Sequence, residues 1–301
     1  MQQSHPLVLT AANRSVTSGS TGRRDHGWES VLTDKLGAGW RHDPPPPVLY
    51  KYRSLAPGPA REFTRDIIVN NRLWFAQASS FNDPFDSFPF FTLDSTPEQY
   101  EAYVRHVVDK ANVDVSDAER EQVFAHLMGL SPEAIAERVQ EAGGDNLQGM
   151  AVCCLSAVND QVLMWSHYAD SHAGLCLRFK TRPLVGDIPD LAYRVSYSAD
   201  RPVVNRATDT HDYDALFDAM LVKADFWAYE QEHRLFRREV LGGDGLETFA
   251  PDRLDGIIFG ARCGPDEQDL VRNWVEERGL EVEFLKAVPD AKRFRVTIEP
   301  A

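Results

Sequence analysis

Apolar and polar positions in the first part of the chain predict two strands, a short helix and a turn. A β-branched and aromatic run covers residues 48–55, a second run covers 72–77, and a helix is expected between them, near 62–70. The segment FNDPFDSFPFF, which begins at Phe81, has an Asn-Asp-Pro core that is typical of a turn. We expect an aromatic strand to follow this turn.

From Pro97 to about Ala142 the apolar residues recur with helical spacing. Three amphipathic segments follow one another, YEAYVRHVVDKA, DAEREQVFAHLMGL and PEAIAERVQEA. Pro132 stands where the third helix can begin, because proline is tolerated in the first turn of a helix. The pattern predicts a helical insert at about 97–142.

The second half of the chain returns to β patterns. The apolar run at 151–157 predicts a buried strand, followed by a short helix that Asn159 or Asp160 caps. At 174–180 apolar and polar residues alternate, which predicts a half-buried strand. Further strands are expected at 193–198, 233–239, 256–260, 281–285 and 294–298, and further helices at 212–227 and 265–279.

These elements do not follow a regular βαβ order, so we expect an α+β fold. Residues 46–301 are expected to form a single globular domain that carries the helical insert. Residues 1–45 are rich in Ser, Thr, Gly and Arg and lead into the prolines Pro44 to Pro47. Such a composition buries little apolar surface, so we expect a disordered N-terminal tail.

Composition and charge narrow the classes of function. The 301 residues carry a formal net charge of −14, which argues against a general nucleic-acid coat and against binding to anionic membranes. No stretch approaches the roughly 18 apolar residues of a membrane span. The four cysteines match neither a disulfide framework nor a zinc pattern. We therefore expect reduced thiols, no metal and a cytoplasmic location.

The first candidate cluster is Tyr50-Lys51-Tyr52-Arg53 on the opening strand. Strand alternation places Lys51 and Arg53 on one face and the two tyrosines on the other. Cations at the end of a strand can pair with a phosphate or bind a ribose. The alternative is an edge strand whose cations are only solvated.

The second candidate cluster is the segment FNDPFD, from Phe81 to Asp86. Asn82 and Asp83 are turn-forming residues whose side chains commonly bond their own backbone, and that is a sufficient structural explanation. The functional alternative is a loop that closes over a ligand and stacks on it with its phenylalanines.

The third candidate cluster, in the segment MWSHYADSHAG, consists of Trp165, His167, Tyr168 and His172. The two histidines lack the i, i+4 spacing of a helical zinc site, so a metal is not expected. Together the four side chains can hold an aromatic, amide-bearing ligand by stacking and hydrogen bonds. The alternative is a core aromatic residue with one satisfied histidine.

The fourth candidate cluster is Glu230 and Glu232 in the segment FWAYEQEHRLF. On a strand, residues two apart share a face, so both carboxylates would enter one pocket. On a continuing helix they would diverge by about 200° and face solvent. The apolar pair Leu235-Phe236 favours a strand from about residue 231.

Taken in order, the segments YKYR, FNDPFD, CLS…MWSHYAD.H.GLCL.F and K..FW.YE.E.RLF, in which dots stand for other residues, resemble the motifs of the bacterial family known as domain of unknown function 2971. The resemblance covers essentially residues 48 to 300 and leaves the tail outside. The name of this family supplies no activity.

A weaker resemblance is to the ADP-ribosyltransferase superfamily, whose enzymes hold NAD in a cleft between two small sheets. It implies an ADP-ribosyltransferase-like split β-sheet core with a helical insert. Glu232 resembles the last Glu of that superfamily's Glu-x-Glu motif, and Arg53 resembles its early Arg. The superfamily's middle Ser-Thr-Ser strand motif has no clear copy, and the sequence LSA at 155–157 is a poor substitute.

The second resemblance implies an NAD-consuming ADP-ribosyltransferase or NAD glycohydrolase-like enzyme, in which a carboxylate stabilises a ribosyl cation. The expected catalytic residues are Glu232, Glu230 and His167. The expected cofactor-binding residues are Arg53, Tyr52, Asn82, Asp83, Trp165, Tyr168 and His172. NAD would be the substrate, no metal would take part, and the acceptor stays open among protein, nucleic acid and small molecule.

Two other classes of function remain open. The chain could be a sensor module that binds a nucleotide-like ligand without turnover. It could also be a metal-free hydrolase that uses His167 or His172 as a general base.

Overall fold

The computed structural model describes residues 45–111, 115–147, 150–181, 192–209, 213–238 and 245–301. These residues divide into two compact units. With the gaps just given, one unit comes from 87–147 and 201–220, and the other from 45–86, 150–200 and 221–301. The expected N-terminal tail, 1–45, lies outside the described residues except for Pro45.

The first unit contains the helical insert. Its helices are α3 (Pro97–Ala111), α4 (Asp117–Met128) and α5 (Pro132–Leu147), so the helices predicted between 97 and 142 are confirmed. Their apolar faces meet in a small core that includes Val104 and Leu127. In addition, α4 begins at a capping box in which Ser116 and Glu119 satisfy each other's backbone N–H groups.

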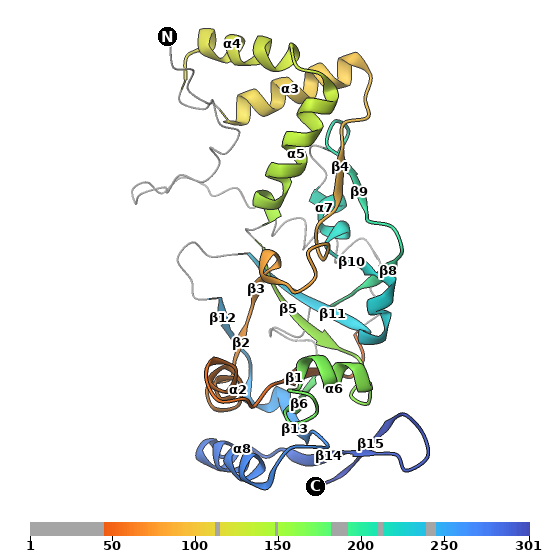
Figure 1. The fold of residues 1–301 in the computed structure, drawn as a ribbon. Coiled ribbons are helices and arrows are strands. Elements are labelled where there is room, and N and C mark those ends of the chain that lie inside the picture. Colours follow the sequence, from red (N-terminus) through yellow and green to blue (C-terminus); the bar gives the residue numbers. More distant parts are fainter. Residues whose placement is uncertain (1–44, 112–114, 148–149, 182–191, 210–212, 239–244) are drawn as a thin grey trace, which may run out of the picture. The chain divides into compact units, whose positions relative to one another are not determined.

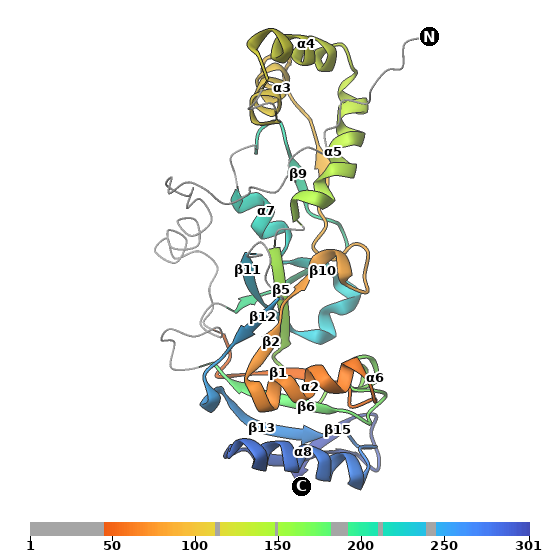
Figure 2. The ribbon, with the colours of Figure 1, turned by 90° about the vertical axis from the view of Figure 1, so that its left-hand side faces the viewer.

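Two short strands and a further helix complete this unit (Figures 1 and 2). Strand β4 (Phe90–Thr92) pairs in parallel with β9 (Val203–Asn205), and α7 (Tyr213–Ala219) follows. Helix α5 packs along β4, where the side chain of Gln140 accepts a hydrogen bond from the Phe91 N–H at 3.0 Å. The aromatic strand expected after the Asn-Asp-Pro turn is therefore present, but short.

The second unit is built on a nine-stranded sheet in the order β15-β14-β13-β6-β1-β5-β11-β7, with β3 also paired to β5. The strands are β1 (Val48–Arg53), β3 (Ala76–Gln77), β5 (Met150–Ser156), β6 (Leu175–Lys180), β7 (Tyr193–Arg194), β11 (Glu232–Arg238), β13 (Leu254–Phe259), β14 (Glu283–Pro289) and β15 (Val296–Pro300). Neighbours are antiparallel except β13 and β14, which α8 (Pro265–Arg278) connects as a crossover. The expected mixed α+β fold is confirmed.

Strands β1 and β5 share a much shorter ladder than β1 shares with β6 or β5 with β11. Along its length β1 pairs with β6, and β5 pairs with β11 over all of its residues. In contrast, the described residues of β1 and β5 face each other as ladder partners only at Tyr50 and Ser156. The two halves of the sheet are joined at this pair and open beside it.

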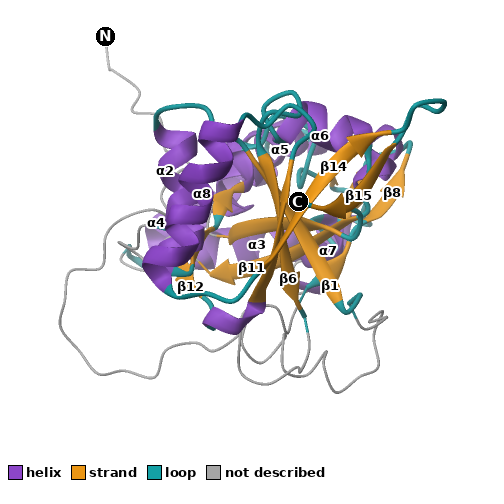
Figure 3. Ribbon diagram, turned by 90° about the horizontal axis from the view of Figure 1, so that it is seen from below, coloured by secondary structure: helices purple, strands orange, loops and turns teal. Residues whose placement is uncertain are grey.

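Helices cover both faces of the sheet. On one face, α2 (Pro59–Asn70) and α8 lie side by side (Figure 3) and pack against a core that includes Leu177. On the other face, α6 (Val162–Tyr168) buries Trp165 against Tyr52 and Cys176. Cys176 is fully buried, so the expectation that 174–180 is a half-buried strand is wrong at this position, because a second core covers its polar-looking face.

Short strand pairs replace parts of the predicted elements. The run at 72–77 divides into β2 (Arg72–Trp74) and β3, and β2 pairs with β12 (Leu246–Thr248).

The helix expected at 212–227 is wrong in its second half. There β10 (Val222–Ala224) pairs in parallel with β8 (Ser196–Ser198), and a 3₁₀ helix spans Asp225–Glu230. Pairing with a distant strand overrides the local helical pattern.

The helix α6 is capped differently from the expectation. Its N-cap is Gln161, whose side chain accepts from the N–H of Leu163, rather than Asn159 or Asp160. The carbonyl of Asn159 instead accepts the indole N–H of Trp165 at 2.8 Å.

Candidate functional site

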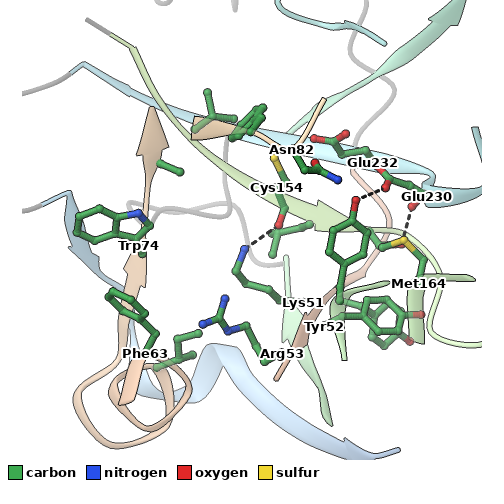
Figure 4. Close-up of a pocket in the computed structure, with 18 of the residues that line it drawn as sticks. Lys51, Tyr52, Arg53, Phe63, Trp74, Asn82, Cys154, Met164, Glu230 and Glu232 are labelled. Carbon is green, nitrogen blue, oxygen red and sulfur yellow. Dashed lines mark hydrogen bonds between the residues drawn. The ribbon is translucent and has the colours of Figure 1, made fainter. Parts of the chain in front are cut away.

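A cavity of about 280 Å³ lies in the second unit, where β1 and β5 separate (Figure 4). Lys51 and Arg53 line it from β1, and Cys154 and Ser156 line it from β5. The other walls come from α2, β2, the FNDPFD turn, α6 and the segment from β10 to the start of β11.

Five buried charged residues form a cluster at this cavity, which we call the charge cluster: Asp86, Lys223, Glu230, Glu232 and Arg234. Their side chains are at most 6% exposed. Lys223 is shared by the carboxylates: its Nζ donates to Glu230 Oε2 at 2.6 Å and to Glu232 Oε2 at 3.0 Å, and it lies 3.4 Å from Asp86 Oδ2. Such pairing makes the burial of these charges tolerable.

Arg234 donates to the second carboxylate oxygens of Asp86 and Glu232. Its Nη2 donates to Asp86 Oδ1 at 2.7 Å, and its Nε donates to Glu232 Oε1 at 2.8 Å. Charge-assisted bonds of this kind fix both position and ionisation. Because three carboxylates face two cations, the charge cluster carries one negative charge in excess when all of its members are ionised.

A left-handed residue brings the two glutamates together. Glu230 ends the 3₁₀ helix, Gln231 has a φ of 44° and a ψ of 51°, and Glu232 begins β11. Tyr197 accepts a hydrogen bond from the N–H of Glu232 at 2.8 Å. The expectation that an extended backbone runs from Glu230 to Glu232 is therefore wrong. The carboxylates converge because the chain turns sharply between them.

The pKa values of the two glutamates are displaced in opposite directions. Burial alone would raise the pKa of Glu232, but the charges of Arg234 and Lys223 outweigh burial and lower this pKa to about 2. Burial raises the pKa of Glu230, and Lys223 offsets it only in part. Two neighbouring carboxylates with separated pKa values are a common arrangement in sites that combine charge stabilisation with proton transfer.

Glu230 is held by two hydroxyl groups as well. Tyr168 donates to Glu230 Oε1 at 2.7 Å, and Ser156 donates to the backbone carbonyl of Glu230 at 2.6 Å. Burial and the nearby negative charge of Glu230 raise the pKa of Tyr168, so this phenol stays a hydrogen-bond donor. Ser156 is also the partner of Tyr50 at the sheet joint, which links the joint to the carboxylates.

Lys51 and Arg53 lie on one face of β1, as alternation predicts, and both line the cavity. Lys51 donates to the carbonyl of Cys154 at 2.9 Å, and Arg53 makes a long contact with the hydroxyl of Thr64, at 3.4 Å. Within the described part of the chain neither has a carboxylate partner. Burial lowers the pKa of Arg53, and a guanidinium remains charged nonetheless.

Several residues of the sequence prediction lie in this site. Tyr52, Arg53, Asn82 and Tyr168 line the cavity, together with Glu230 and Glu232. Tyr52 is mostly a core residue, since its hydroxyl donates to the Val158 carbonyl at 2.9 Å and its ring packs edge-on against Trp165.

Asp83 supports the site from outside the cavity lining. Its Oδ1 accepts from the Phe85 N–H at 2.9 Å, as expected for a turn, and its Oδ2 accepts from the indole N–H of Trp227 at 2.8 Å. The turn is thereby anchored to the 3₁₀ helix that ends at Glu230.

Besides Asp83, three further expected site residues lie away from the cavity lining. Trp165 is fully buried in the core. His172 pairs with the hydroxyl of Ser166 at 3.2 Å, and its ring is stacked near Trp165. His167 is exposed and pairs with the hydroxyl of Tyr229 at 3.1 Å.

Lys223, Arg234 and Asp86 received no role from the sequence alone. Arg234 follows Glu232 by two residues on a strand, and this spacing was a usable signal, because such residues share a face. Lys223 falls in a segment predicted as a helix and Asp86 is the last residue of a turn motif, so spacing alone assigned neither a role, although both belong to segments that carry the family resemblance.

Within the ranges that the structure describes, no group of three or more His, Cys, Asp or Glu side chains is arranged to hold a metal ion. No helix in these ranges has the length and apolar character needed to cross a membrane.

No curated protein and no solved structure matches this chain. A family model does match it over residues 164–235, a segment that contains Tyr168, Lys223, Glu230, Glu232 and Arg234. Over these residues the chain resembles the family described as "Protein of unknown function (DUF2971)".

Proposed function

We propose that this chain consumes NAD, as an ADP-ribosyltransferase or an NAD glycohydrolase-like enzyme, and that Glu232 is its essential carboxylate. The observation that carries the proposal is the pair of buried glutamates at a cavity whose other wall holds Lys51 and Arg53. The pair combines an ionised carboxylate with one whose pKa is raised.

Glu232 supplies the negative charge. In the proposed reaction the bond from the ribose carbon to the nicotinamide nitrogen breaks, and its electron pair goes to that nitrogen, which loses its positive charge. The ribose is left as an oxocarbenium-like cation. An ionised, fixed carboxylate stabilises this cation more in the transition state than in the ground state. Arg234 and Lys223 keep Glu232 ionised and hold it in place.

Glu230 receives the proton. When water or an acceptor hydroxyl attacks the ribosyl cation, a carbon–oxygen bond forms and the attacking group loses a proton. A carboxylate with a raised pKa is a better acceptor for that proton than one with an ordinary pKa. Water as the nucleophile gives free ADP-ribose, and another acceptor gives an ADP-ribosylated product.

The opening of the sheet supports the same proposal. The cavity lies where β1 and β5 separate after a single ladder pair, which agrees with a ligand held between two halves of a split sheet. Lys51 and Arg53 offer positive charge to a pyrophosphate inside a chain of net charge −14.

One observation favours a second candidate, a module that binds NAD without turnover. Lys223 already occupies an oxygen of each glutamate, at 2.6 and 3.0 Å, and a carboxylate neutralised in this way stabilises a cation less. A hydrolase that uses His167 or His172 has less support, because neither histidine lines the cavity.

The test is incubation of the purified protein with NAD, followed by chromatography of free nicotinamide and ADP-ribose. We expect the parent to release nicotinamide, and Glu232→Gln to slow this release by about 10²- to 10³-fold. Glu281→Gln, which changes an exposed glutamate, is the matched control and should keep the parent rate.

Binding and folding measurements separate the candidates. If NAD binds to the parent and to Glu232→Gln and neither releases nicotinamide, the protein is a binding module. If both release nicotinamide equally fast, Glu232 is not the essential carboxylate. Thermal melting of each variant shows whether a lost rate comes from a lost fold.

A further inference from the structure

Two large aromatic side chains line the cavity without being buried. Phe63 from α2 and Trp74 from β2 are each 42% exposed, and their ring centroids are 5.8 Å apart at an interplanar angle of 44°. Large aromatic residues contribute most to stability when they are fully buried. A pair left open toward the cavity is therefore available to a ligand.

The position of Trp74 is fixed by the strand that pairs with β2. Gly245, just before β12, has a φ of 74°, and a Cβ at this position would lie 2.9 Å from the Phe75 carbonyl and 3.2 Å from two ring atoms of Trp74. Only glycine fits this contact. The backbone at Gly245 therefore packs directly against the indole ring of Trp74. This contact holds the ring in place, although part of the ring stays exposed.

Lys51 and Arg53, which have no carboxylate partner within the described ranges, adjoin this aromatic pair. Figure 4 shows Lys51 and Arg53 directed into the space between Phe63 and Trp74 on one side and Glu230 and Glu232 on the other. Arg53 has no carboxylate partner among the described residues, as noted above. An aromatic surface next to uncompensated cations matches a planar base that carries a phosphate.

We infer that Phe63 and Trp74 form a base subsite, on which the nucleobase of a nucleoside phosphate stacks while its phosphate is bound by Lys51 and Arg53. The subsite also gives the orientation of NAD in the cavity, an assignment that rests on the proposed function. The adenine of NAD lies on Phe63 and Trp74, the pyrophosphate lies at the two cations, and the reactive ribose lies at Glu232. Stacking by Trp165 is excluded because this ring is fully buried.

AMP tests the subsite without any turnover. We expect calorimetry to show that AMP binds the parent and that Trp74→Ala weakens this binding by about tenfold or more, which is the usual effect of removing one stacked aromatic side chain. Phe63→Leu should weaken it by a smaller factor. Ribose 5-phosphate has no base, and its affinity should be equal for the parent and Trp74→Ala.

Two further variants separate stacking from damage to the fold. Trp74→Phe keeps a ring and should retain AMP binding within about threefold of the parent. Phe226→Leu changes a side chain that is 67% exposed and does not line the cavity, and it should bind AMP as the parent does. Melting temperatures should agree among these variants, since the side chains that they change are partly exposed.

The outcomes distinguish this inference from the proposed function. If AMP binds in a manner that depends on Trp74 and NAD is not consumed, the base subsite stands and the proposed enzyme does not. If NAD is consumed and Trp74→Ala changes neither AMP affinity nor the KM for NAD, the base subsite is wrong and the enzyme stands. Absence of AMP binding to the parent, or equal loss of AMP and ribose 5-phosphate binding in Trp74→Ala, also overturns the subsite.

Discussion

The guanidinium of Arg234 donates a hydrogen bond to the carboxylate of Asp86 at 2.7 Å, with both side chains almost completely buried. This contact joins the end of the FNDPFD turn to the strand that carries Glu232. The turn therefore does more than reverse the chain. Its first aspartate, Asp83, anchors Trp227, and its second, Asp86, supports the guanidinium that fixes Glu232.

Loss of Arg234 should destabilise the fold strongly. In Arg234→Met, Asp86 and Glu232 would remain buried and would lose the guanidinium that now pairs with both of them. Removing one partner from a buried ion pair typically costs about 3 to 5 kcal/mol. Urea unfolding followed by circular dichroism should show a reduction of this size in the free energy of unfolding.

Arg65→Met is the matched control. Arg65 pairs with Glu277 at 3.0 Å in the same unit, but the two side chains are 37% and 51% exposed. Exposed pairs contribute about 0 to 1 kcal/mol, so this variant should unfold nearly as the parent does. If both variants lost the same free energy of unfolding, the charge cluster would contribute no more to stability than an exposed ion pair does.

Acid should destabilise the parent through Glu232. Its pKa is about 2 in the fold against an ordinary value of 4.5. A carboxylate whose pKa is lowered on folding stabilises the fold above its unfolded pKa, and this contribution, on the order of 3 kcal/mol, is lost as the pH falls from 4.5 toward 2. The raised pKa of Glu230 acts with the opposite sign, because its protonation favours the fold.

The slope of stability against pH isolates this effect. In Glu232→Gln the free energy of unfolding is lower at neutral pH, because the cations lose a partner, but it should fall less between about pH 5 and pH 3 than in the parent. Glu281→Gln should keep the slope of the parent. An unchanged slope in Glu232→Gln would contradict a lowered pKa at this residue.

Lys223 should control the ionisation of both glutamates. In Lys223→Met the carboxylates lose their shared cation, so the pKa of Glu232 should rise above about 2 and that of Glu230 should rise further. Titration of ¹³C-labelled glutamate carboxylates by NMR measures both. Lys180→Met, at a side chain that is 50% exposed and lies outside the cavity lining, should leave these titrations unchanged.

Gln231 should tolerate glycine and reject a β-branched residue. Its φ of 44° is left-handed, which glycine adopts freely and valine adopts only with strain. We expect Gln231→Gly to unfold within about 1 kcal/mol of the parent, and Gln231→Val to lose about 1 to 3 kcal/mol. Denaturant unfolding of the two variants side by side provides the comparison. Equal stabilities would show that the turn between the glutamates can relax.

Long apolar runs were sufficient to predict the central strands. Residues 48–53, 150–156 and 232–238 are strands because their apolar and β-branched side chains fill the cores on the sheet faces, and this requirement is visible in the pattern. The strands β9, β10 and β12 each have three residues. Each exists because a distant strand pairs with it, and local patterns do not contain that partner.

The site was predicted in part for a related reason. Glu230 and Glu232 were expected to share a pocket because residues two apart lie on one face of a strand. They do share one, although a left-handed turn rather than an extended strand brings them together. Lys223 reaches them from β10, a strand that the local pattern did not indicate. The burial of Trp165 in the core likewise depends on which face of α6 the sheet covers.

The pairing of β1 has a consequence for how fast the protein folds. Val48 lies opposite Lys180 in one ladder and Tyr50 lies opposite Ser156 in another, so β1 gains both of its neighbours only after very long loops have closed. Loop closure of this kind must precede the contacts that stabilise it, and proteins dominated by such contacts fold in milliseconds to seconds rather than microseconds. The residues that line the cavity run from Tyr50 to Leu246, so the cavity is incomplete until segments far apart in the sequence have come together. After dilution from denaturant, competence to bind a ligand should therefore return with the slowest refolding phase, well after the helices α3 to α5 have formed.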